Sequence, residues 1–254
     1  MKEAQDDTTD TQEQFFNREL SWLGFARRVL ALVEDSQIPL LKRVKFAGIM
    51  GMLHDEFFMK RITGLKRQMV TKPKKISIDG RTPRQEFEAC RQEIVDQMQT
   101  LESVINKEIC PAMASAGFAI CDHQDLDKSQ KIQIRDYFRH SVQPIITPLA
   151  VDAEHPFPFV SNLGLNLAVL VPEGSGKKDR FVRIKVPNNR PRWVPLEDNK
   201  GFVPLEQVIA ANLDMMFGGA SPNAIYYFRV TRGAEGDVRE GEGKGLQEPG
   251  AIIR

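Results

Sequence analysis

The stretch NRELSWLGFARRVLALVE, residues 17–34, decides the character of the first half of the chain. Asn17 directly precedes a run of apolar residues, and an asparagine at that position accepts hydrogen bonds from the free amides of a helix's first turn. The apolar side chains recur at helical spacing: Leu20, Leu23, Ala26, Leu30 and Val33. The pattern therefore predicts a helix from Asn17 to about Glu34 with one buried face.

Two further helical segments follow. Pro39 suits the first position of a helix, and it precedes a second apolar face of Leu40, Leu41, Val44, Ile49 and Met50. Thr82, Pro83 and Gln85 form a capping-box start, after which apolar residues alternate in steps of three and four: Phe87, Cys90, Ile94, Met98, Leu101 and Ile105. These steps are typical of a helical bundle. We expect the last helix to stop by Pro111, because proline lacks the N–H that a helix interior needs.

The second half of the chain has a different pattern. Ile132, Ile134, Phe138 and Val142 predict one more amphipathic helix that ends before Pro144. Strand-like runs then alternate with Pro and Gly: LNLAVLV (165–171), FVRIKV (181–186), RWVPL (192–196) and YYFRVT (226–231). A short helix is expected between the last two runs. The fold class is therefore α+β, an all-α helical bundle followed by a mixed α/β domain with a mostly antiparallel sheet.

The same patterns predict four parts along the 254 residues. Residues 1–14 are polar and acidic and are expected to be a disordered leader. Residues 15–112 form the N-terminal helical domain, and residues 113–232 form the mixed domain. Residues 233–254 are Gly- and Glu-rich and are expected to be flexible, with the start of a truncated element at the end.

Composition excludes several classes of protein. With 41% apolar and 27% charged residues the chain should fold. It has no apolar run near the roughly 18 residues of a transmembrane segment and no secretory signal at its start, so we expect a cytoplasmic protein. Three cysteines without CxxC spacing indicate reduced, buried thiols. The four histidines lack metal-ligand spacing, so no metal site is expected, and His155, in the turn HPFPFVSN, is better explained by structure than by catalysis.

Charge is unevenly distributed. Residues 15–84 hold 15 Lys and Arg against six Asp and Glu, although the whole chain has a net charge of +1. Candidate polyanion-facing residues are Lys60, Arg61, Lys66, Arg67, Lys72, Lys74 and Lys75. Such a cluster attracts phosphates through its summed field, although a solvated helix face and a flexible loop would explain much of it. Aromatic residues do not alternate with these cations as stacking on nucleic-acid bases requires, so nucleic acid is not the expected partner.

Several long strings resemble one family. FFNRELSWLGFARRVLALVEDSQIPLLKRVKFAGI (15–49) and DEFFMKRITGL (55–65) are similar to the opening of the long, four-domain polyphosphate kinases of the phosphohistidine type. PLAVDAEHPFPFVSNLGLNLAVLV (148–171), FVPLEQVIAANLDMMF (202–217) and YYFRVTR (226–232) resemble the second, or head, domain of that family in the same order. The resemblance extends over nearly all of residues 15–232.

The resemblance implies an ATP:polyphosphate phosphotransferase that uses ATP or ADP with Mg²⁺, inorganic polyphosphate and a phosphohistidine intermediate. In this family the chemistry comes chiefly from two C-terminal domains, so we expect this chain to be inactive alone and assign it no catalytic residue. The head domain contributes to dimer contacts in the family, which implies a possible homodimer. The alternative is a non-catalytic polyanion-binding or dimerisation module.

The resemblance also points to one nucleotide contact. The family pattern usually reads NLDEFF, with the asparagine near adenine, and this chain places Leu53 there. A leucine packs against a base but forms no hydrogen bond with it, and the neighbouring His54 could substitute through its ring nitrogens. Asp55 and Glu56 match the family pattern, and they are expected either to contact ligand or to pair with Arg61 or cap a helix.

Overall fold

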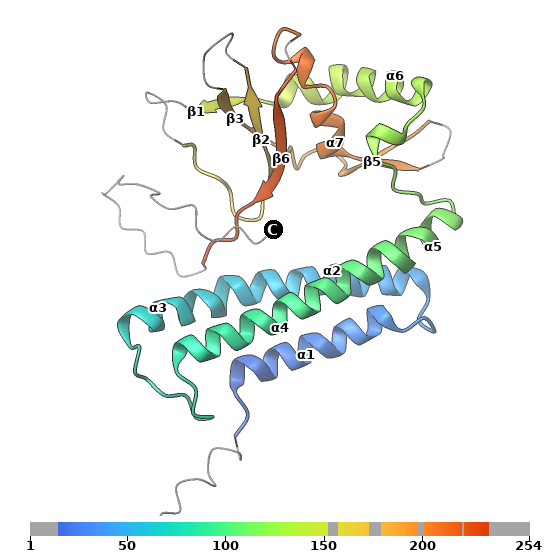
Figure 1. Ribbon diagram of the computed structural model, residues 1–254. Helices are drawn as coiled ribbons and strands as arrows, with labels where there is room; N and C mark the ends of the chain where they lie inside the picture. The colour runs from blue at the N-terminus through green and yellow to red at the C-terminus, as the bar shows by residue number, and fades with distance from the viewer. Residues whose placement is uncertain (1–14, 152–156, 173–178, 198–200, 220, 234–254) are drawn as a thin grey trace, which may run out of the picture.

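The N-terminal part of the chain folds as a bundle of helices (Figure 1). The computed structural model describes residues 15–151, 157–172, 179–197, 201–219 and 221–233. The predicted leader, His155 and nearly all of the predicted flexible end lie outside these residues. The bundle consists of α1 (Arg18–Glu34), α2 (Leu40–Phe57), η2 (Phe58–Ile62), α3 (Thr63–Thr71), α4 (Pro83–Val104), η3 (Ile105–Ile109) and α5 (Cys110–Ser115). We call residues 15–115 the helical domain.

The helices begin at or next to the residues predicted from the sequence. Asn17 is the N-cap of α1 and accepts hydrogen bonds from the amides of Glu19 and Leu20. Thr82 caps α4 in the predicted capping box with Gln85. Pro39 lies one residue earlier than predicted, because it is the N-cap of α2 and the helix begins at Leu40.

Two long helices are interrupted by π turns rather than ended. η2 joins α2 to α3, and η3 joins α4 to α5, so each pair is one continuous helical rod. The prediction that the helix ends by Pro111 is wrong, because helical structure continues to Ser115. Pro111 follows the π turn η3 and is the second residue of α5.

In two helices of the bundle, the buried face differs from the one predicted from the sequence. Leu23, Ala26, Leu30 and Val33 of α1 are fully buried, as predicted. On α4, however, Met98 is 42% exposed, and Gln97 is buried in its place with 1% exposure. Leu41 of α2 is 66% exposed. Each of these helices therefore turns a slightly different face inward from the one that apolar spacing alone selects.

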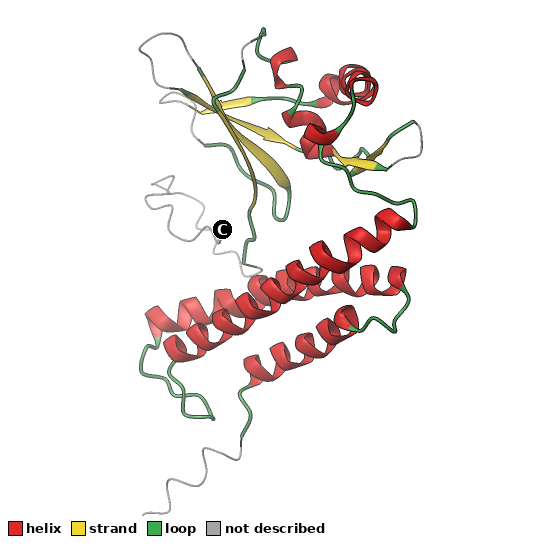
Figure 2. Cartoon of the chain, turned by 45° about the vertical axis from the view of Figure 1, so that its right-hand side comes forward, coloured by secondary structure: helices red, strands yellow, loops and turns green. Residues whose placement is uncertain are grey.

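The second part of the chain packs helices on one face of an antiparallel sheet (Figure 2). We call residues 119–233 the mixed domain. Its helices are η4 (His123–Asp125), α6 (Lys128–Tyr137), η5 (Phe138–Val142), η6 (Gln143–Ile145), α7 (Leu205–Ala210) and η7 (Leu213–Met215). Its strands are β1 (Leu149–Val151), β2 (Leu165–Val171), β3 (Arg180–Lys185), β4 (Trp193–Pro195), β5 (Phe202–Pro204) and β6 (Ala224–Arg229). The predicted strand runs overlap β2, β3, β4 and β6, although β3 begins one residue and β6 two residues before its run, and β1 and β5 were not predicted.

Sheet order is β1-β3-β2-β6, with β4 and β5 in a separate two-stranded sheet. Leu167 in β2 lies opposite Ile184 of β3 and Tyr227 of β6, and every neighbouring pair is antiparallel. Leu167 and Ile184 are fully buried and belong to one apolar cluster with Phe138 and Val208 from the helices. The predicted α+β class and the antiparallel sheet are confirmed.

No helix in the described ranges is long and apolar enough to cross a bilayer. The three cysteines are free thiols, as predicted. Cys90 is buried, whereas Cys110 and Cys121 are partly exposed. Burial and the nearby carboxylates of Glu86 and Glu19 raise the pKa of Cys90 to about 12, so its thiol is unreactive.

Candidate functional site

A cavity of about 220 Å³ lies at the end of the helical domain where α1 begins. The lining combines cations with carboxylates: Asn17, Arg18, Glu19, Leu65, Gln68, Lys75, Ser77, Ile78, Arg81, Pro83 and Glu86. These residues come from the start of α1, from α3, from the loop after α3 and from the start of α4. The loop that carries the predicted lysines therefore forms one wall of this cavity.

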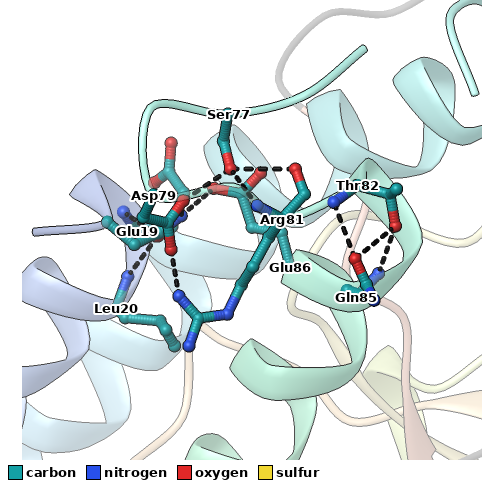
Figure 3. Close-up of polar contacts among 9 residues, drawn as sticks. Glu19, Leu20, Ser77, Asp79, Arg81, Thr82, Gln85 and Glu86 are labelled. Atoms are coloured by element: carbon teal, nitrogen blue, oxygen red, sulfur yellow. Dashed lines mark hydrogen bonds and ion pairs between the residues drawn. The ribbon is translucent and has the colours of Figure 1, made fainter. Parts of the chain in front are cut away.

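Asn17 connects the three elements around the cavity. Its Oδ1 caps α1, while its Nδ2 donates to Glu86 Oε1 at 2.8 Å and to Asp79 Oδ1 at 3.1 Å. Figure 3 shows Asp79 and Ser77 of the loop directed toward the start of α1. Ser77 Oγ donates to Asp79 Oδ1 at 2.5 Å. This network fixes the loop against the helices.

The charges of the cavity are partly compensated. Arg81 forms an ion pair with Asp79, and Arg61 Nε lies 3.6 Å from Glu19 Oε2. Burial raises the pKa of the Asp79 carboxyl, but hydrogen bonds from Ser77, Asn17 and Arg81 outweigh it and hold that pKa below its usual value. Pairing of this kind removes part of the positive field that the sequence suggests.

The predicted basic residues divide into two groups. Lys60 pairs with Glu56, Arg61 approaches Glu19, and the Lys66 ammonium lies 5.8 Å from the centroid of the Phe87 ring. Arg67 also has a contact. Three lysines on the loop are exposed to solvent: Lys72, Lys74 and Lys75. The loop therefore carries the part of the positive charge that is most accessible to a ligand.

Leu53 and His54 lie in the middle of the helical domain on α2. Leu53 is half-buried and packs against the apolar cluster that contains Met50 and Val104. His54 is 5% exposed, and its Nε2 lies 3.0 Å from Gln97 Oε1. The His54 ring thus faces the interior of the bundle, whereas Leu53, at the position expected to contact nucleotide, is partly accessible to solvent.

The structure does not bring Leu53 and the lysine loop together. A helix rises about 1.5 Å per residue, so Leu53 and Thr71 are about 27 Å apart along the helix axis. Figure 1 shows the loop at the end of the bundle away from the mixed domain, while α2 passes beneath that domain. The candidates for nucleotide contact and for polyanion contact therefore occupy two separate places.

Asp55 and Glu56 have partners other than the one predicted. Asp55 forms a two-point ion pair with Arg229 of the mixed domain, and Glu56 pairs with Lys60. The hydrogen bond from Lys60 lowers the pKa of Glu56. Pairing of either carboxylate with Arg61 is therefore not the arrangement found, because Arg61 faces Glu19 on the opposite helix.

Two buried polar residues escaped the sequence analysis. Gln97 Oε1 accepts a hydrogen bond from His54 Nε2 at 3.0 Å, and Gln97 Nε2 donates to the Leu23 carbonyl at 3.0 Å. Arg43, which reads as one of several surface cations on α2, is 7% exposed and donates to the Val33 carbonyl at 2.7 Å. Neither has a sequence signal, because each partner is distant along the chain.

Within the described part of the chain, no group of three or more His, Cys, Asp or Glu side chains could hold a metal ion.

Comparison with known proteins assigns both domains. The sequence model of the polyphosphate kinase N-terminal domain matches residues 15–121, and that of the polyphosphate kinase middle domain matches residues 129–248. A polyphosphate kinase of Parasynechococcus marenigrum (strain WH8102) is 41% identical over 92% of this chain and 34% of its own length. One from Mycobacterium avium (strain 104) is 42% identical over 90% of this chain and 33% of its own length.

The fold has a counterpart among solved structures. The crystal structure of polyphosphate kinase from Porphyromonas gingivalis superimposes with a TM-score of 0.75 at 23% identity. The match covers 87% of this chain and 33% of that structure. This chain thus spans about a third of the length of the relatives it matches.

Proposed function

Because this chain belongs to the polyphosphate kinase family, we propose that its two domains serve the reversible transfer of the terminal phosphate of ATP to inorganic polyphosphate. The match of two consecutive family domains over residues 15–121 and 129–248 is the observation that carries this proposal. The domain division expected from the sequence, 15–112 and 113–232, stays a prediction. We place the protein in the cytoplasm, where ATP is available.

In this proposal the chain positions substrates and does not form the phosphoryl intermediate. Phosphoryl transfer through a covalent intermediate needs a nucleophile and cations that stabilise the transferring group. His54 is engaged with buried Gln97, and no histidine is among the residues that line the cavity at the start of α1. We therefore assign the phosphohistidine to the two thirds of the relatives that this chain does not match, and we assign no residue here to Mg²⁺.

We assign nucleotide contact to the surface of α2 around Leu53. The leucine offers an apolar side chain against which a purine ring can pack, but it has no donor or acceptor for the base edge. The buried His54 lies next to this surface and is held in place by its hydrogen bond with Gln97. A polyphosphate chain is assigned to the exposed lysines of the loop, and a homodimer through the mixed domain remains part of the proposal.

We expect the purified chain, free of contaminating kinase, to transfer no radiolabel from ATP to polyphosphate. Joining it to the remaining domains of the M. avium relative should restore transfer. Label transfer by the chain alone would contradict the assignment of the chemistry to other domains. Failure of the joined protein to transfer label, when the M. avium enzyme itself does so, would contradict the proposed function and favour a non-catalytic binding module.

Reversing the three loop lysines tests the polyphosphate assignment. We expect Lys72→Glu, Lys74→Glu and Lys75→Glu together to weaken binding of long-chain polyphosphate at least about tenfold near 0.1 M salt, because a summed field holds a polyanion. Retention on immobilised polyphosphate over a salt gradient measures this. The helices should be unaffected, since a loop carries all three side chains.

The matched control reverses three exposed lysines elsewhere on the helical domain, Lys42, Lys45 and Lys107, with the same change in net charge. It should weaken retention less than the loop variant. Equal losses would mean that net charge, and not the loop, binds the polymer. Stronger retention on single-stranded nucleic acid than on polyphosphate at equal salt would also contradict the assignment.

A further inference from the structure

The mixed domain touches one face of the continuous helix formed by α2, η2 and α3. Arg229, at the end of β6, donates from Nη2 to Asp55 Oδ1 at 2.6 Å and from Nη1 to Asp55 Oδ2 at 3.0 Å. One turn further along the helix, Asn162 Nδ2 lies 3.1 Å from Met59 Sδ. Figure 1 shows β6 descending from the sheet toward this helix.

A third contact is made by the backbone of the mixed domain. A Cβ on Gly233 would lie 2.5 Å from Thr63 Cγ2 and 2.7 Å from its Oγ1. A larger residue at position 233 would have to displace the Thr63 side chain or move this segment away from the helix, so the close approach depends on glycine. Asp55, Met59 and Thr63 together form what we call the docking face.

The π turn η2 aligns the docking face. A regular α-helix turns about 100° per residue, so eight residues would rotate Thr63 about 80° away from Asp55. The π turn Phe58–Ile62 accommodates one additional residue, which removes about 100° of this rotation. Thr63 then lies within about 20° of Asp55, and all three residues of the docking face point the same way.

The second attachment between the domains lies at the end of α5. Gly117 has φ +87°, and the following segment pairs with β5 through Phe202 N to Ala119 O and Cys121 N to Phe202 O, both at 2.8 Å. This segment therefore moves with the mixed domain. Gly117 N donates to Ala114 O at 3.0 Å and Phe118 N to Met113 O at 2.9 Å, so this short connection ends α5 and links the helices to the mixed domain.

The ion pair at the docking face has a well-defined geometry, and it is partly exposed to solvent. The side chain of Asp55 is 15% exposed and that of Arg229 is 50% exposed. A bidentate carboxylate–guanidinium pair fixes both distance and orientation, whereas domains joined by small polar contacts otherwise move relative to one another. Of the contacts at the docking face, this charged, bidentate pair is therefore the one best suited to fix the orientation of the two domains.

We propose that Asp55 and Arg229 are positioning residues, which latch the mixed domain onto the docking face and prevent its rotation about Gly117. The role of this ion pair rests on the proposed function. By holding Asp55 to the mixed domain, the pair sets the position of the Leu53 surface, which lies two residues earlier on the same helix, relative to the mixed domain. Release of the latch turns that surface away from the mixed domain.

Charge reversal tests the latch in the whole chain. We expect Asp55→Arg and Arg229→Asp, each alone, to increase the radius of gyration and broaden the pair-distance distribution in small-angle X-ray scattering. Asp55→Arg/Arg229→Asp should restore the wild-type profile, because the reversed pair can form the same contact. Raising salt to 1 M should shift the wild-type profile toward that of the single variants, since it screens exposed charges.

Glu56→Gln is the control, because Glu56 pairs with Lys60 within the same helix and does not touch the mixed domain in the described residues. It should scatter like the wild type. Single variants that scatter like the wild type, with helix content unchanged by circular dichroism, would overturn the proposal, as would a double variant that scatters like the single ones. These readouts need no substrate, so their failure is distinct from failure of the proposed function.

Discussion

Phe57→Ala is expected to lower the free energy of unfolding of the helical domain by about 3–5 kcal/mol, because truncation of a buried phenylalanine removes apolar burial and leaves a cavity. Phe57 is 1% exposed, and its ring centroid lies 5.0 Å from that of Trp22. The cluster around it draws on all the long helices of the bundle: Leu23, Ile62, Leu65, Cys90 and Ile94.

Urea denaturation followed by tryptophan fluorescence and circular dichroism measures this loss, since Trp22 reports directly on the cavity. Phe25→Ala is the matched control: Phe25 is 46% exposed on α1 and should cost less than about 1 kcal/mol. Equal losses for the two variants would show that Phe57 does not hold the bundle together.

Arg43→Ala is expected to lower the free energy of unfolding by about 3 kcal/mol, which is the second largest effect expected. The Arg43 guanidinium donates to the carbonyl of Val33, near the end of α1, and to Glu108 Oε2 at 2.5 Å in η3. Removing it leaves the buried Val33 carbonyl without this donor and deletes a long side chain from the interior. Loss of a charged donor to a buried acceptor usually costs about 1.5–3 kcal/mol, and the lost packing adds to it.

Lys42→Ala provides the comparison, because Lys42 is the exposed neighbour of Arg43 on α2 and its truncation should change the free energy of unfolding by less than about 0.5 kcal/mol. Urea denaturation of both variants measures the difference. Glu108→Gln should cost less than Arg43→Ala, since an amide oxygen still accepts the hydrogen bond. If Arg43→Ala were as mild as Lys42→Ala, Arg43 would be an ordinary surface cation.

The sequence predicts helix starts well because they depend on neighbouring residues. Asn17 and Thr82 act as caps through atoms two or three residues away, and their side-chain chemistry is visible in the sequence. The π turns were not predicted, although they leave a trace. Phe57 and Ile62 are both buried and five residues apart, as are Val104 and Ile109. A step of five between buried positions indicates a π turn, which a search for steps of three and four overlooks.

The candidate site was predictable only in part, for a related reason. Charge counting finds the loop lysines, but it treats Arg43 as equivalent to them, because burial depends on packing between distant segments. Likewise His54 reads as an available imidazole until Gln97, 43 residues away, is placed beside it. The Asp55 partner lies 174 residues along the chain. Local patterns contain no information about such pairs, and only the fold reveals them.

Pairing of residues 119–121 with β5 has a practical consequence for dissecting the protein. Gly201 has φ +148°, and a Cβ there would lie 2.5 Å from the Ala119 carbonyl oxygen, so this segment fits tightly against the hairpin of β4 and β5. A mixed domain expressed by itself from residue 123 would lose these partners and expose the edge of β5 to other chains. Starting the expressed piece at Phe118 keeps that edge covered, so the edge cannot pair with strands of other chains.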